Sequence, residues 1–128
     1  MNPDATSLPP ILIVDDDTLI TESLAFVLGG EFQVWTAASR EQAVQRLREM
    51  PTPRVALVDL GLPPLPHRPD EGFALIGAIL AHSPETRIIV LSGQSDNSNA
   101  RHARALGATE FIAKPADPDA LRDSILRI

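Results

Sequence analysis

The sequence predicts an α/β domain in which one parallel five-stranded sheet is covered by helices on both faces. Five short apolar segments alternate with amphipathic segments of helical period along the 128 residues. The apolar segments are continuous rather than alternating, which is typical of strands buried on both faces of a parallel sheet. Right-handed crossovers through the intervening helices then give five successive strand–helix units, the doubly wound (βα)5 arrangement.

The predicted strands are short and rich in aliphatic side chains. The first, Ile11-Leu12-Ile13-Val14, contains no polar residue. The full set comprises residues 11–14, 33–37, 54–58, 87–91 and 109–113. Because only 4% of the chain is aromatic, aliphatic residues and alanine must fill the core, and Trp35 is expected to lie within it.

The predicted helices have apolar side chains at three- and four-residue intervals. The first ends at Gly29-Gly30, and the second begins at the capping box Ser39-Arg40-Glu41-Gln42 and ends before Pro51. The five helices lie around residues 20–28, 40–50, 73–80, 97–106 and 118–128. The fourth has only a thin apolar face, so we expect it to be weakly packed.

Composition excludes several kinds of function. The net charge of −6 argues against direct nucleic-acid binding, which needs a basic surface. The absence of cysteine excludes disulfides and thiolate metal sites, and no apolar run approaches the roughly 20 residues of a membrane helix. Residues 1–9 are polar and contain prolines, so we expect a disordered lead rather than a signal peptide, followed by one domain over residues 10–128. A cytoplasmic location is the resulting expectation.

Polar side chains follow four of the predicted strands where each strand ends. Asp15 and Asp16 follow the first strand, Asp59 the third, Ser92 the fourth and Lys114 the fifth. The carboxyl ends of parallel strands share one edge of the sheet, and ligands bind there at the point where the strand order reverses. We therefore expect these side chains to converge on one site, with the neighbouring Asp17 as a helix-capping residue outside it.

Each residue type in this set suits phosphoryl transfer. Clustered carboxylates provide the hard oxygen ligands that Mg²⁺ prefers. A carboxylate is also a nucleophile towards phosphorus, giving an aspartyl phosphate. A lysine and a hydroxyl at neighbouring strand ends can neutralise and bind phosphoryl oxygens, and phosphoryl transfer depends mostly on such positioning.

These motifs resemble the receiver domains of two-component response regulators. The similarity rests on ILIVDDD (11–17), VALVDLGLP (55–63), VLSG (90–93) and FIAKP (111–115), and it extends over nearly the whole chain. The resemblance implies the flavodoxin-like fold with strand order 2-1-3-4-5. It also implies Mg²⁺ as cofactor and a sensor histidine kinase as partner.

The resemblance also implies a role for each matched residue. Asp59 corresponds to the phosphoacceptor, and Asp15 and Asp16 to the acidic pair that binds Mg²⁺ together with Asp59 and the backbone carbonyl of Gly61. Ser92 and Lys114 correspond to the residues that contact the phosphoryl group. Ser92 and Phe111 correspond to the switch residues, and Lys114–Pro115 to a cis peptide bond. The face formed by the fourth helix, fifth strand and fifth helix is expected to relay phosphorylation to an output domain or partner outside this chain, and to support a homodimer.

Two features depart from the usual receiver pattern. The segment after Pro63 is about five residues longer than usual before it reaches Gly72, and its prolines predict a stiff, extended loop beside the site. The resemblance implies that the residues at positions 61 and 94 tune the phosphoryl lifetime; Gly61 has no side chain for this, and the amide of Gln94 could contact an attacking water. The three histidines show no ligand spacing and carry no site prediction.

Two other functions are compatible with parts of the pattern. Asp15-Asp16-Asp17 provides the Asp-x-Asp of a small Mg²⁺-dependent phosphatase of the haloacid-dehalogenase type, although Leu19 and the short chain do not fit that family. In that case Asp15 rather than Asp59 would carry the phosphoryl group. A pseudo-receiver that binds partners without phosphorylation is the other alternative, and it would require a disrupted acidic site.

Overall fold

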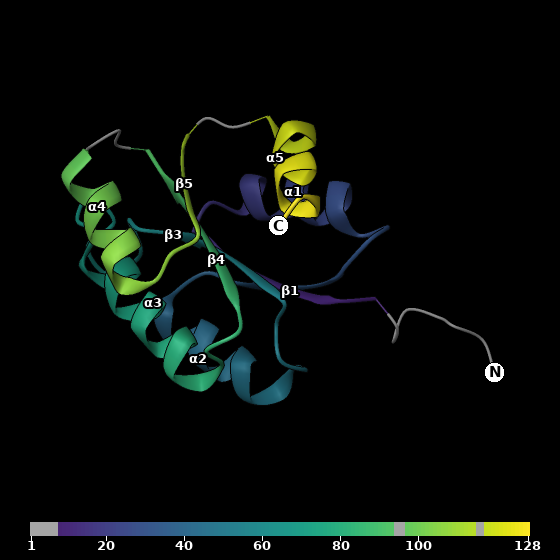
Figure 1. Ribbon diagram of the computed structural model, residues 1–128, viewed down its shortest axis with the longest axis horizontal. Helices are drawn as coiled ribbons and strands as arrows, with labels where there is room; N and C mark the ends of the chain where they lie inside the picture. The colour runs from purple at the N-terminus through teal and green to yellow at the C-terminus, as the bar shows by residue number, and fades with distance from the viewer. Residues whose placement is uncertain (1–7, 94–96, 115–116) are drawn as a thin grey trace.

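The computed structural model describes residues 8–93, 97–114 and 117–128, which form one parallel sheet between two layers of helices (Figure 1). The strands are β1 (Pro10–Val14), β2 (Gln33–Ala37), β3 (Val55–Asp59), β4 (Arg87–Ser92) and β5 (Glu110–Ala113). The helices are α1 (Thr18–Leu28), α2 (Arg40–Glu49), α3 (Asp70–His82), α4 (Asn97–Leu106) and α5 (Pro118–Leu126). The strand order is β2-β1-β3-β4-β5, so the predicted doubly wound fold and strand order are confirmed.

Alternate residues of the central strands point to opposite faces of the sheet. Leu12 and Val14 of β1 pack with the face covered by α2, α3 and α4, whereas Ile11 and Ile13 pack with the face covered by α1 and α5. Figure 1 shows the same division of the helices between the two sides. This explains why the strands read as continuous apolar runs, because both members of each alternation are buried.

Burial differs between central and edge strands. Every residue of β3 is buried, whereas most residues of β2 and β5, at the two edges, are only partly buried. Trp35 lies on β2 and packs against the core without being fully buried, and its indole Nε1 donates a hydrogen bond to Oε1 of Gln33 (3.2 Å). The prediction that Trp35 is a core residue was therefore only partly correct, because an edge strand has no neighbouring strand on one side.

The helix boundaries follow local capping. Asp17 is the N-cap of α1, where its Oδ1 accepts a hydrogen bond from the backbone N–H of Leu19 (3.0 Å), as predicted. Ser39 caps α2, and the Oε1 of Gln42 accepts from the backbone N–H of Ala38. Helix α5 ends at Leu126, two residues earlier than predicted.

Helix α4 is the least buried of the five. Of its residues, Ala103 alone is fully buried. The ring of His102 lies 4.1 Å from that of Phe73 on α3, measured between ring centroids. The predicted weak packing of this helix is confirmed, and low burial favours local rearrangement.

The N-terminal lead predicted for residues 1–9 lies mostly outside the described residues. The carbonyl of Pro9 accepts a hydrogen bond from the backbone N–H of Gln33 (2.9 Å), so regular structure begins beside β2. No helix in the described part of the chain has the length and apolar character needed to span a membrane.

Candidate functional site

The polar residues predicted at the strand ends surround one pocket at the carboxyl edge of the sheet. The pocket has a volume of about 370 Å³. Its lining includes Asp15, Asp16, Asp59, Ser92 and Lys114. The chain leaves β1 towards β2 on one side and returns to β3 on the other, so Asp15 and Asp59 flank the point where the strand order reverses. This is the position at which doubly wound proteins bind ligands.

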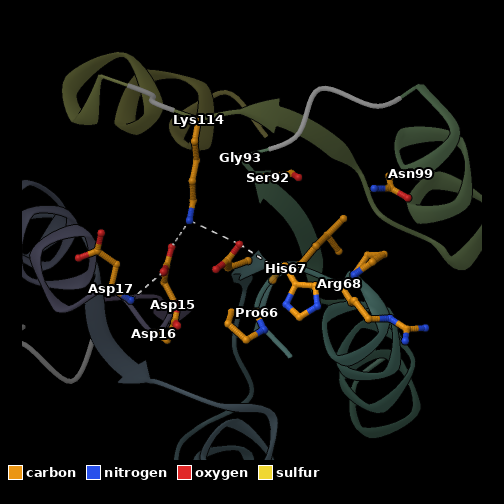
Figure 2. A pocket seen from close by; sticks show the side chains of 14 residues that line it. Asp15, Asp16, Asp17, Pro66, His67, Arg68, Ser92, Gly93, Asn99 and Lys114 are labelled. Atoms are coloured by element: carbon orange, nitrogen blue, oxygen red, sulfur yellow. Dashed lines mark hydrogen bonds and ion pairs between the residues drawn. The ribbon is translucent and has the colours of Figure 1, made fainter. Parts of the chain in front are cut away.

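Asp15 is held by its backbone and by both carboxylate oxygens. Its backbone N–H donates to the carbonyl of Ala37 (3.1 Å). Its Oδ1 accepts from the backbone N–H of Asp17 (2.9 Å), and its Oδ2 accepts from the Nζ of Lys114 (2.6 Å; Figure 2). The side chain is only 1% exposed, so this carboxylate is fixed in orientation.

Lys114 connects the two buried carboxylates. It follows β5 directly, and its backbone N–H donates to the carbonyl of Ser92 (2.8 Å), which places it beside the end of β4. Its Nζ lies 2.6 Å from Asp15 Oδ2 and 3.4 Å from Asp59 Oδ1. Burial lowers the pKa of Lys114, but the hydrogen bond to Asp15 and the charges of both carboxylates outweigh burial, so the pKa lies above its ordinary value.

Asp59 is the last residue of β3 and is 6% exposed. Its Oδ1 accepts a hydrogen bond from the backbone N–H of Gly61 (3.2 Å) and forms an ion pair with the Nζ of Lys114 (3.4 Å). Burial and the nearby charge of Asp15 raise the pKa of Asp59 to about 6, although Lys114 and the Gly61 N–H act in the opposite direction. The carboxylate is therefore destabilised in its charged form, and a cation placed beside it would relieve that cost.

Three carboxylates meet the requirements of a divalent cation site. One oxygen from each of Asp15, Asp16 and Asp59 lies within 4.8 Å of the others. Asp16 is exposed, whereas the other two are buried. An all-oxygen set with one solvent-facing side fits Mg²⁺, which keeps several waters and takes one or two carboxylates from the protein.

Ser92 and Phe111 occupy different environments. Ser92 ends β4, is 4% exposed and lines the pocket. Phe111 lies on β5 and packs partly buried against the core on the α2–α3–α4 side, so it is not among the described residues that line the pocket. Gln94 and the Lys114–Pro115 peptide bond lie outside the described residues.

Four consecutive residues of the β3–α3 loop line the pocket and were not predicted from the sequence. They are Pro66, His67, Arg68 and Pro69. Figure 2 shows Pro66, His67 and Arg68 across the pocket from Asp15 and Asp17. The loop length and its prolines were the only signals, and they could not indicate which side chains would face the acids.

The β3–α3 loop is folded back rather than extended. The N–H of Arg68 donates to the carbonyl of Leu65 (3.0 Å), which closes a turn, and Leu62 is completely buried. A methyl group added at Gly61 would overlap the backbone carbonyl of Pro66. The expectation of an extended loop was therefore wrong, because burial of Leu62 and the turn at residues 65–68 draw the chain against Gly61.

Gly61→Ala should accordingly lower the free energy of unfolding by about 1–3 kcal/mol, the usual cost of inserting a methyl group into a filled space. Urea unfolding of the metal-free protein measures this. Gly77→Ala is the matched control, because among the described residues nothing lies within 4 Å of the added methyl group and Gly77 is in the middle of α3. The free energy of unfolding of this control variant should rise by about 0.5–1 kcal/mol, because alanine has a higher helix propensity than glycine. Equal stability of the two variants would contradict the close packing of Pro66 on Gly61.

The fold and the pocket define a class: a doubly wound α/β protein with an acidic, lysine-containing site at the reversal of strand order. Residues 11–126 match the family described as response regulator receiver domain, so the chain belongs to the receiver family. This family, rather than the haloacid-dehalogenase phosphatases, accounts for the Asp-x-Asp at residues 15–17.

Individual relatives agree with the family match. The chain is 34% identical over 118 residues to the acid tolerance regulatory protein ActR of Rhizobium meliloti, covering 91% of this chain and 58% of ActR. It is 34% identical over 116 residues to the transcriptional regulatory protein KdpE of Staphylococcus aureus, covering 90% of this chain and 47% of KdpE. The chain thus spans about half the length of these curated relatives.

A solved structure shows the same fold. The CheY-like response regulator receiver domain protein from Methanospirillum hungatei superposes with a TM-score of 0.83 at 30% sequence identity, over 94% of this chain and 92% of that one. The predicted family and fold are therefore both confirmed.

Proposed function

We propose that this receiver domain accepts a phosphoryl group on Asp59 from a sensor histidine kinase in a Mg²⁺-dependent reaction. One observation carries the proposal: the Nζ of Lys114 contacts both Asp15 and Asp59, and all three residues line the same pocket. A lysine in this position holds the nucleophile in place and can neutralise charge that arrives on phosphoryl oxygens.

The proposed transfer forms one bond and breaks another. A carboxylate oxygen of Asp59 attacks the phosphorus of a phosphohistidine, and the P–N bond breaks with its electron pair leaving on the imidazole nitrogen. The carboxyl group of Asp59 loses its negative charge when the new P–O bond forms. The Lys114 ammonium can then bind a phosphoryl oxygen instead of Asp59. Later attack by water at phosphorus breaks that P–O bond and returns Asp59 as a carboxylate and inorganic phosphate.

Asp15, Asp16 and Asp59 would hold the metal, with the carbonyl of Gly61 as a further oxygen ligand. Bound Mg²⁺ neutralises charge on the carboxylates and on the incoming phosphoryl group. The fixed orientation of Asp15, set by Lys114 and the N–H of Asp17, supports this assignment. Asp17 itself caps α1 and takes no part.

Signal output is proposed to pass through Ser92 and Phe111. Ser92 is buried at the pocket, and its hydroxyl would move towards a phosphoryl oxygen. Phe111 lies on β5 beside the weakly buried α4, so a shift of its ring can follow that movement. Phosphorylation would thereby favour one of two arrangements of the α4–β5–α5 face, which we propose binds an output domain, a partner or a second copy. Histidine kinases use ATP, so we also propose a cytoplasmic location.

Incubation with acetyl phosphate tests the proposal. Intact-mass measurement should show one phosphoryl adduct that needs Mg²⁺ and is absent from Asp59→Asn. The control is Asp119→Asn, which removes an acid in the first turn of α5 and should keep the adduct. An adduct that survives Asp59→Asn but is lost in Asp15→Asn would instead make Asp15 the nucleophile. No adduct under any condition would reject the mechanism above and leave a pseudo-receiver or a domain that accepts the group from its kinase alone.

A further inference from the structure

The β3–α3 loop, residues 60–69, forms one side of the pocket and is held in place at both ends. Near its start, Leu62 is completely buried. At its other end, in the first turn of α3, the N–H of Gly72 donates to the carbonyl of Leu60 (3.2 Å). Beside that end, Glu71 forms a two-point ion pair with Arg40 of α2, with distances of 3.0 Å from Nε and 3.4 Å from Nη2. Both ends are thus fixed, and the residues between them are held against the site.

Within this loop, Arg68 carries a permanent positive charge and lines the pocket. Its Nη2 lies 3.0 Å from Oδ2 of Asp70, and both side chains are 57% exposed. In Figure 2 its side chain points away from Lys114. An exposed ion pair of this kind contributes little stability, about 0–1 kcal/mol, so Arg68 can exchange Asp70 for a stronger partner at small cost.

The charge of the pocket favours such an exchange when a phosphoryl donor arrives. The described lining includes the acids Asp15, Asp16, Asp17 and Asp59 and the permanent cations Lys114 and Arg68. Lys114 is already shared between Asp15 and Asp59. With Mg²⁺ on the acids these charges nearly cancel, so a doubly charged donor brings negative charge in excess. Of the two cations in the described lining, Arg68 is the one not paired with a buried acid. Guanidinium groups bind phosphoryl oxygens with two parallel hydrogen bonds, and a doubly charged phosphoryl group attracts a guanidinium more strongly than the single charge of Asp70 does.

We propose that Arg68 binds non-bridging oxygens of the phosphoryl donor and of phosphorylated Asp59, releasing Asp70 when it does so. The inference rests on the proposed function. It makes Arg68 a second phosphoryl-binding cation beside Lys114, supplied by the β3–α3 loop. Arg68 takes and gives no proton, so the bonds formed and broken are those of the transfer to Asp59 described above.

The test uses the rate of adduct formation against acetyl phosphate concentration at saturating Mg²⁺. Arg68→Ala should raise the half-saturating concentration about fivefold, as expected for loss of one charged hydrogen-bonding contact at a solvent-exposed position. Arg68→Lys, which keeps the charge but loses the two-point geometry, should recover part of that loss. Arg48→Ala is the matched control, because it removes an exposed positive charge from the last turn of α2.

Asp70 supplies a test in the opposite direction. Asp70→Asn removes the competitor for Arg68 and should lower the half-saturating concentration about twofold. In the Arg68→Ala background the same change should have no effect, which separates release of Arg68 from a general change of charge. A direct readout is the Nε–H signal of Arg68 in NMR spectra, which should shift when beryllofluoride and Mg²⁺ are added.

The outcomes separate this inference from the function on which it rests. If wild type forms the adduct on Asp59 but Arg68→Ala behaves like Arg48→Ala, the role of Arg68 is wrong and the proposed function stands. An unchanged Nε–H signal in the beryllofluoride complex would overturn the inference in the same way. If wild type forms no adduct on Asp59, both are rejected.

Discussion

Replacing Lys114 with Gln should lower the free energy of unfolding of the metal-free protein by about 3 kcal/mol at pH 8. Removal of one partner from a buried ion pair leaves an uncompensated charge, which usually costs about 3–5 kcal/mol, and the low end applies because Lys114 is 19% exposed. Asp15 and Asp59 would then face each other without a cation between them. Urea unfolding at pH 8 measures the loss.

The sign of the pH dependence follows from the raised pKa of Lys114. A lysine whose pKa is raised on folding contributes stability below its unfolded value of 10.5, and that contribution is lost as the pH rises through the higher folded value. The difference between wild type and Lys114→Gln should therefore be constant near pH 8 and shrink in strongly alkaline solution. Mg²⁺ should also reduce this difference in stability, because a second cation then compensates the charges of Asp15 and Asp59. A loss no larger than that of Arg48→Gln would show that Lys114 does not compensate the carboxylates.

Lys114 is also the only lysine of the chain, which makes the site accessible to selective labelling. Reductive ¹³C-methylation would place an NMR probe on its Nζ and on the chain's N-terminal amine alone. The Lys114 signal should shift when Asp59 is replaced with Asn, since the two groups lie 3.4 Å apart.

Asp59→Asn should raise the free energy of unfolding of the metal-free protein by about 2–3 kcal/mol at pH 8. Asp59 has a pKa of about 6 in the folded chain against an ordinary value of 3.8, so its charged form is disfavoured by roughly two units, at about 1.4 kcal/mol each. Asparagine removes the charge, and its side-chain oxygen can still accept the Gly61 N–H. Urea unfolding of both proteins at several pH values measures the gain.

The pH window of this effect is set by the same two values. A carboxyl group whose pKa is raised on folding favours the folded state below pH 3.8, and this contribution is lost as the pH rises to about 6. The gain from Asp59→Asn should thus be near zero below pH 4 and complete above pH 7. Asp16→Asn is the control, because Asp16 is exposed and should change stability little. A gain that is the same at pH 4 and pH 8 would mean that burial of the Asp59 charge is not its cause.

Mg²⁺ should diminish the benefit of Asp59→Asn. A cation among the three carboxylates favours the charged form of Asp59 and binds wild type more strongly than the variant. Protons compete for the same carboxylate, so the apparent affinity for Mg²⁺ should fall as the pH drops below about 6. Thermal unfolding with and without Mg²⁺ at pH 5 and pH 8 separates these effects.

The fold class, and the edge of the sheet where the polar residues meet, could be predicted from the sequence alone. Continuous apolar segments such as Ile11–Val14 are needed only where both faces of a strand are covered, and this periodicity is local information. Once the strands are parallel, their carboxyl ends must lie along one edge. The sequence therefore predicts that Asp15, Asp59 and Lys114 lie at the same site.

How these groups interact, and which other residues join them, depends on contacts that form only in the folded chain. The pKa of Asp59 depends on its burial and on the separate contacts with Asp15 and Lys114, residues 44 and 55 positions away in the chain. The placement of Arg68 depends on the fold of a loop whose ends are fixed by Leu62, Gly72 and the Arg40–Glu71 ion pair. Loop conformation and electrostatic coupling arise from distances between residues far apart in sequence, and no periodicity or spacing along the chain encodes those distances.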